Sequence, residues 1–196
     1  MTCISCRSQL DEHDDKAPRL EALFVLAITL GLRPGELRGL TWDLADLDNA
    51  VIKVWRSARK GGDTKTPASK RTLELPKRAV KALIKHKALQ DRERAAAGSA
   101  WQDNNLVFCL EDGTPYTGDA PNLRFSRITK RAGPGWAGLG HWHAHESRHT
   151  AVSIMSKNGV PIQDISDTVG HKSTHVTETV CRYTNSSPSS RPAPLR

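Results

Sequence analysis

Apolar side chains recur along most of the chain at intervals of three and four residues, a spacing that predicts helices. The clearest run follows Arg19 and reads LEALFVLAITLGL, which we expect to form a buried helix ending near Gly31. Pro34 suits the first turn of a short helix in PGELRGL, because proline is well tolerated at the first helical position. Further helices are predicted over residues 77–94, 122–131, 144–157, 161–169 and 176–183.

Two short segments carry the alternation and β-branched residues that are typical of strands. They are residues 50–57 (AVIKVWRS) and 71–75 (RTLEL), and a polar turn with two glycines joins them as a hairpin. A third strand-like run covers residues 106–109. The sequence therefore predicts a mainly α fold with a small antiparallel β-sheet, an α+β class.

The folded part is expected to be one domain, residues 18–184, with a polar segment on either side. Residues 1–17 form a predicted disordered leader, and residues 185–196 are rich in serine and proline, a composition typical of disorder. Cys3 and Cys6 form a C-x-x-C pair, which is half of a zinc site. No second pair follows in the sequence, so we interpret the leader as reduced and metal-free.

The charge balance favours a polyanionic partner such as DNA. The 29 Lys and Arg residues exceed the 21 Asp and Glu residues, which gives a formal net charge of +8. A basic soluble protein without such a partner is the alternative that charge alone leaves open. No apolar run reaches the roughly 18–20 residues needed to span a bilayer, and the first residues lack a signal region. We therefore predict a cytoplasmic protein with no membrane association.

Basic and imidazole side chains occur in a series of short motifs spread over the chain. The motifs are GLRPGEL with Arg33, TKTPASKR with Lys65, HESRHT with His145 and Arg148, and VGHKS with His171. Their order and spacing, and the flanking segments GLTW and NGVPIQDISDTVGHKS, resemble the active-site set of the tyrosine recombinases of the phage-integrase type. That set runs Arg, Lys, His-x-x-Arg, His and Tyr. The resemblance covers residues 19–183.

The resemblance implies the tyrosine-recombinase catalytic domain fold and site-specific DNA recombination, as integration or excision. It implies double-stranded DNA as the partner, self-association on DNA, a covalent protein–DNA intermediate, and no metal or other cofactor. Arg33 and Arg148 would clamp the phosphate oxygens, since guanidinium groups bind phosphate bidentately. His145 and His171 would orient the phosphate and transfer protons. Lys65 would protonate the departing 5′ oxygen.

Two roles, those of the lysine and of the nucleophile, each have two candidate residues. Lys70 is an alternative to Lys65 on the same hairpin. The tyrosine of the family follows the second active-site histidine by about nine or ten residues, and here that position is Cys181. Tyr183, the displaced candidate, lies two residues later, which on a helix is a rotation of about 200° and a rise of about 3 Å. A thiol on one methylene is too short to replace a phenol, so we expect impaired strand cleavage.

Little sequence precedes the predicted catalytic domain, because only residues 1–17 lie before it. The chain therefore reads as a truncated or decaying integrase, and a DNA-binding remnant without catalysis is the alternative within the same family.

A zinc hydrolase is the alternative from another class. His145, Glu146 and His149 match the motif H-E-x-x-H, in which two histidines on one helix face bind zinc and the glutamate acts as general base. A third ligand is available at His171 or Glu178. This interpretation leaves the paired arginines, the hairpin lysine and the basic charge unexplained, so the recombinase is preferred.

Overall fold

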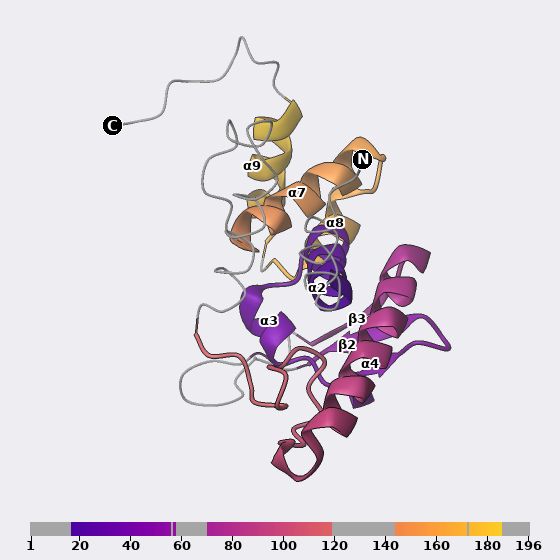
Figure 1. Ribbon diagram of the computed structural model, residues 1–196. Coiled ribbons are helices and arrows are strands. Elements are labelled where there is room, and N and C mark those ends of the chain that lie inside the picture. Colours follow the sequence, from indigo (N-terminus) through magenta and orange to yellow (C-terminus); the bar gives the residue numbers. More distant parts are fainter. Residues whose placement is uncertain (1–16, 56, 58–69, 119–143, 172, 186–196) are drawn as a thin grey trace, which may run out of the picture.

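The computed structural model describes residues 17–55, 57, 70–118, 144–171 and 173–185 (Figure 1). The first half of the chain supplies α2 (Ala17–Leu30), α3 (Pro34–Arg38), the 3-10 turn η1 (Trp42–Leu44), β1 (Ala45–Asp46), β2 (Val51–Val54), β3 (Arg71–Glu74), α4 (Lys77–Ala97) and the 3-10 turn η3 (Gly98–Ala100). The second half supplies α7 (Ala144–Lys157), α8 (Ile162–Val169) and α9 (Thr174–Asn185).

The predicted helices inside these residues are all present, with ends shifted by no more than a few positions. Pro34 occupies the first turn of α3 as expected. Gly170, in the left-handed conformation with φ of 65°, ends α8, and a glycine adopts that conformation without steric cost. The helix predicted over residues 122–131 lies outside the described residues, as do both predicted disordered ends up to residue 16 and from residue 186.

The sheet is antiparallel with the order β1-β2-β3, so the predicted hairpin gains a third strand. Ile52 of β2 pairs with Leu73 on one side and Ala45 on the other. The strand β1 is only two residues long, too short to produce a pattern in the sequence.

The prediction of a strand over residues 106–109 is wrong in detail. Leu106 and Cys109 each form one isolated bridge, with Thr41 and Pro115 respectively. Val107 and Phe108 between them are fully buried, with no exposed surface. The apolar run therefore reflects burial in the core and not strand pairing, and a short apolar run by itself does not distinguish the two.

Helix α2 is the centre of the structure, because it packs against α4 and against α7 (Figure 1). Leu23 and Leu26 are completely buried in the first core cluster with Ile52 and Leu83. Contact on several sides explains why the α2 sequence is almost continuously apolar. A second cluster fills the space among α7, α8 and α9. Among the described residues no helix has the length and apolar character that crossing a bilayer requires.

Candidate active site

Arg33 connects the start of α3 to the turn that follows α8. Its backbone N–H donates to Oε2 of Glu36 at 3.0 Å, and its Nη1 donates to Oε1 of the same carboxylate at 3.0 Å. Its Nη2 donates to the carbonyl oxygen of Gly170 at 2.7 Å, 137 positions further along the chain. The Arg33 side chain retains 33% of its surface exposed, whereas that of Glu36 has none. The guanidinium is thus fixed in direction and still accessible.

Arg148 of α7 lies beside this arrangement and is only 2% exposed. Its Nη1 donates to the carbonyl oxygen of Gly31 at 2.7 Å, and its Nη2 is buried without a hydrogen-bond partner within the described part of the chain. Burial, together with the positive charges of Arg33 and Arg71, lowers the pKa of Arg148 to about 9, against the opposing effect of Glu36. A buried cation with an unused donor beside a second guanidinium is suited to hold an anion.

Gly31 allows this close packing at the end of α2. Its φ is +61°, and a Cβ added there would lie 2.9 Å from Cγ1 of Val169 and 3.3 Å from Cβ of Ala151. Only glycine fits without a shift of its neighbours. The carbonyl oxygen of Gly31, which is two residues before Arg33 in the sequence, therefore accepts a hydrogen bond from Arg148.

His171 follows Gly170 directly and is held from two sides. Its backbone N–H donates to the carbonyl oxygen of Ser166 at 3.0 Å. Its ring atom Nδ1 lies 2.8 Å from Oγ1 of Thr177, which is fully buried on α9. A hydrogen bond at one ring nitrogen fixes the orientation of the ring.

Cys181 lies one helical turn after Thr177 on α9. Side chains four residues apart share a helix face, so position 181 is on the face that contacts His171. Cys181 is 6% exposed and belongs to the apolar cluster with Val152, Ile165 and Val169. The backbone of Tyr183 lies in the last turns of the same helix, and its side chain is outside the described residues.

The other predicted residues are only partly described. Lys65 lies outside the described residues, and His145 is placed in the first turn of α7 by its backbone alone. Lys70, the alternative to Lys65, is exposed, and its Nζ lies 5.8 Å from the ring centre of Trp55. His149 is exposed on α7. Within the described residues no group of three or more metal-ligating side chains converges.

Sequence reasoning missed Glu36 and Arg71. Arg71, the first residue of β3, donates from Nη1 and Nη2 to the Glu36 carboxylate at 3.2 and 2.8 Å. Glu36 is the third residue of α3, a position where an acid commonly accepts a hydrogen bond from the residue before the helix. That signal was present in the sequence. Arg71 had none, since it reads as one more basic residue of a basic hairpin.

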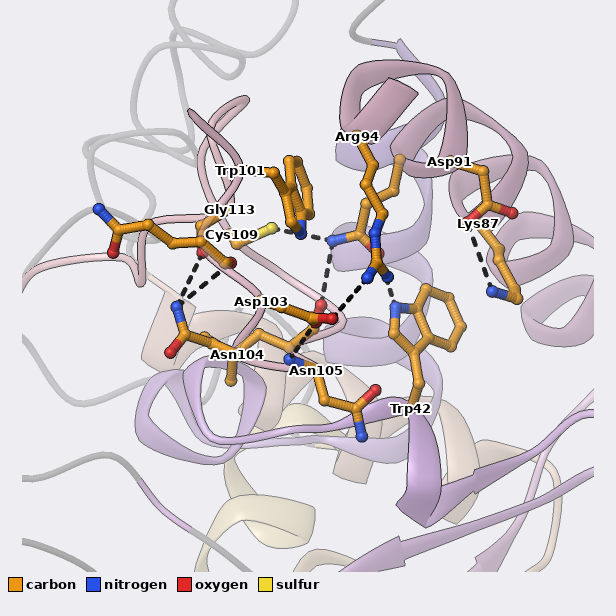
Figure 2. A pocket seen from close by; sticks show the side chains of 13 residues that line it. Trp42, Lys87, Asp91, Arg94, Trp101, Asp103, Asn104, Asn105, Cys109 and Gly113 are labelled. Atoms are coloured by element: carbon orange, nitrogen blue, oxygen red, sulfur yellow. Dashed lines mark hydrogen bonds and ion pairs between the residues drawn. The ribbon is translucent and has the colours of Figure 1, made fainter. Parts of the chain in front are cut away.

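A small pocket of about 90 Å³ lies at the end of α4 (Figure 2). None of the residues that line it belongs to the predicted active-site set. Arg94 and Asp103 form an ion pair of 2.5 Å across it. Gln90 accepts from Trp42 at 2.6 Å and donates to Sγ of Cys109 at 2.8 Å. Burial raises the pKa of the Cys109 thiol. Several of the lining side chains are thus paired with one another, and the volume is small for a ligand site.

The surface near the hairpin and along α4 is strongly basic. Helix α4 carries seven basic and two acidic residues. On the outer face of the sheet, Trp55 is 40% exposed, and the Nζ atoms of Lys53 and Lys70 lie 5.3 and 5.8 Å from its ring centre. An aromatic ring between two lysines suits contact with a nucleic-acid strand.

Comparison with known families settles the class of protein. The model of the phage integrase family matches residues 7–190. The chain belongs to the phage integrase family. The predicted resemblance is thereby confirmed.

Curated relatives agree with this assignment. The chain is 43% identical over 174 residues to an integrase of Streptomyces ambofaciens, in a match that covers 83% of this chain and 44% of that protein. It is 32% identical over 185 residues to a tyrosine recombinase XerC-like protein of Caldanaerobacter subterraneus subsp. tengcongensis, covering 84% of this chain and 46% of the relative. The chain thus spans about half the length of these members of the family.

Solved structures show the same fold. XerA recombinase superposes with a TM-score of 0.67 at 22% identity, over 90% of this chain and 57% of XerA. The Tn1549 transposon integrase, solved in complex with transposon right end DNA, superposes with a TM-score of 0.62 at 23% identity, over 82% of this chain and 53% of that integrase. The predicted mainly α fold with a small antiparallel sheet is therefore confirmed as the fold of tyrosine recombinases.

Proposed function

We propose that this chain holds one phosphate of double-stranded DNA between Arg33 and Arg148, as the catalytic part of a site-specific recombinase. The observation that carries the proposal is the pair of anchored guanidiniums. Arg33 donates to the residue before His171, and Arg148 donates to a residue just before Arg33. Arg33 is therefore fixed against the segment that carries His171, and Arg148 is fixed against the segment that carries Arg33. Fixed donors stabilise the charge that develops on a phosphate without reorganising during the reaction.

The chemistry assigned to this site is transfer of a phosphodiester. An attacking oxygen forms a new bond to phosphorus, and the bond to the 5′ oxygen breaks. Arg33 and Arg148 would bind the two non-bridging oxygens. His145 and His171 would accept or return the proton of the attacking group, and Lys65 would protonate the 5′ oxygen as it leaves. The arginines and the lysine supply the positive charge, so the proposed reaction uses no metal or cofactor.

Position 181 is the proposed place of the nucleophile, and in this chain a cysteine occupies it. Two observations support the place: position 181 shares a helix face with Thr177, and Thr177 contacts the His171 ring. The sulfur of Cys181 is packed in an apolar cluster and is not accessible to a DNA strand. We therefore propose that strand cleavage is impaired in this copy while the phosphate site is retained.

The proposed DNA contact surface continues from this site along the hairpin. Lys65 belongs to the segment between β2 and β3, and the platform of Lys53, Trp55 and Lys70 lies at the base of that hairpin. Contacts of this kind add affinity without sequence specificity, because they bind the backbone and the faces of bases. A DNA substrate implies work in the cytoplasm, and rejoining of strands implies association of several copies on DNA.

The proposal is tested by restoring the nucleophile. The variant Cys181→Tyr is incubated with a library of nicked duplexes of random sequence, in which cleavage traps the covalent adduct. Adducts are resolved on a denaturing gel and their DNA is sequenced. We expect adducts from Cys181→Tyr and none from Cys181→Tyr combined with Arg148→Gln. Equal adduct yields from the two variants would show that Arg148 does not hold the reacting phosphate.

A further inference from the structure

Arg71 is a largely buried arginine beside the candidate site that has no role in the proposed reaction. Its side chain is 10% exposed. Its Nε donates to the carbonyl oxygen of Thr168 at 2.8 Å, close to the end of α8. Its two terminal nitrogens donate to the two carboxylate oxygens of Glu36. One guanidinium thus joins the sheet, α3 and α8, and all of its hydrogen bonds go to protein atoms that adjoin the predicted site.

The turn that carries His171 packs directly on Arg71. A Cβ added at Gly170 would lie 2.9 Å from Nη1 and 3.2 Å from Cζ of Arg71. The carbonyl oxygen of Gly170 accepts from Arg33 on its other side. The backbone immediately before His171 is therefore held between two guanidiniums, and displacement of Arg71 would displace it.

The charges of the site explain why a second arginine is needed on Glu36. The Glu36 carboxylate has no exposed side-chain surface, and Arg33 and Arg71 both donate to it. If Arg71 were absent, the negative charge of Glu36 would be offset by Arg33, which pairs with it, and by Arg148, whose positive charge it also attracts. The pairing would hold Arg33 against α3 and reduce the net positive charge that faces a phosphate. Buried charges require compensation because water does not screen them.

We propose that Arg71 is a positioning residue of the phosphate site. By pairing with Glu36 and packing on Gly170, Arg71 keeps the positive charge of Arg33 available for the phosphate and keeps its side chain directed towards it. This inference rests on the proposed function, since phosphate is the anion that Arg33 would bind. Arg71 itself touches neither the phosphate nor the reacting atoms in this proposal. The predicted signature is coupling between Arg71 and Glu36, because the effect of one depends on the presence of the other.

The test measures the affinity of the complete chain for inorganic phosphate, from the rise in melting temperature against chloride at equal ionic strength. We expect Arg71→Gln to weaken phosphate binding roughly tenfold or more, and Glu36→Gln to strengthen it. In the Glu36→Gln background, the loss caused by Arg71→Gln should shrink to less than about threefold. Lys85→Gln is the matched control, because Lys85 is an exposed lysine of α4 already paired with Glu21 at 3.4 Å, and it should change nothing.

Two outcomes overturn the assignment of Arg71. Equal losses from Arg71→Gln in both backgrounds would mean that the charges act independently, and weaker binding by Glu36→Gln would mean that the pair is only a structural support. If Arg71→Gln does not fold, Arg71→Lys keeps the positive charge beside Glu36 but loses the paired hydrogen bonds, so it should weaken phosphate binding by less than about tenfold. A chain that binds neither phosphate nor DNA would instead overturn the proposed function itself, and Arg71 with it.

Discussion

Oγ1 of Thr177 lies 2.8 Å from Nδ1 of His171, so helix α9 is attached to the candidate site by the face that also carries Cys181. The next positions on that face are separated by four residues, which is close to one turn. Position 183 is about 200° around the helix from position 181. Through Thr177, position 181 is therefore related to His171 of the predicted site, ten positions earlier in the sequence.

Restoring a tyrosine at position 181 should create strand-cleaving activity, whereas removing the tyrosine at position 183 should not matter. We expect Cys181→Tyr to form covalent adducts with nicked DNA and Tyr183→Phe to leave the behaviour of the unmodified chain unchanged. The larger ring must fit where Cys181 is 6% exposed, so overpacking should lower stability by about 1–3 kcal/mol. Adduct yield and urea unfolding are measured on the same preparations.

Cys181→Phe is the control for that experiment, since it fills the same space without a hydroxyl group. It should lower stability as Cys181→Tyr does and form no adduct. The expectation of impairment would be wrong if the unmodified chain formed adducts and Tyr183→Phe abolished them.

Binding to duplex DNA should be weak, largely independent of sequence and strongly dependent on salt, because backbone contacts release counterions. Replacing Lys53 and Lys70 by glutamine should reduce the slope of log affinity against log salt concentration by about 2. Trp55→Ala should weaken binding to single strands more than to duplexes, since unpaired bases are free to stack. Labelled DNA is titrated at several salt concentrations, with Lys85→Gln as the control. Tight binding that is insensitive to salt would contradict this prediction.

Zinc content separates the recombinase from the hydrolase. We expect the purified chain to contain no stoichiometric zinc by elemental analysis, and Glu146→Gln to leave phosphate and DNA binding unchanged. The measurement also covers Cys3 and Cys6. One zinc per chain, together with a peptidase activity lost in Glu146→Gln, would reverse the preference between the two classes.

His86 should make the fold sensitive to mild acid. The ring is fully buried, stacks on Phe108 with ring centres 5.3 Å apart, and donates from Nε2 to the carbonyl oxygen of Val107 at 2.6 Å. Burial lowers the pKa of His86 from 6.5 to about 4. The unfolded chain therefore binds the proton first, and the neutral ring's contribution to stability is present above pH 6.5 and lost as the pH falls towards 4.

The size of that effect follows from the shift in pKa and is on the order of 3 kcal/mol when complete. The variant His86→Phe keeps the stacking and cannot titrate. Its free energy of unfolding in urea should fall less than that of the unmodified chain between pH 7 and pH 4.5. The difference between the two chains isolates His86 from the other histidines. Parallel loss of stability in both would contradict the assignment.

Much of the local structure was readable because it depends on neighbours in the sequence. The apolar spacing of α2 and α7, the proline at the start of α3 and the glycine at the end of α8 act within a few residues. The strand β1 was not predicted, since two residues carry no period. Residues 106–109 were misjudged because their apolar side chains enter the core without pairing along their length.

The sequence by itself determined the family, the order of the helices and the prediction of Arg33, Arg148 and His171 as site residues, because motifs and spacing are local properties. Only the tertiary structure decided which groups meet. The ring of His171 contacts Thr177, and Glu36 pairs with Arg71 from 35 positions away. These contacts join the turn after α8 to α9 and the start of β3 to α3. No local pattern specifies them, since a buried charge finds its partner through the packing of whole elements and not through its neighbours in sequence.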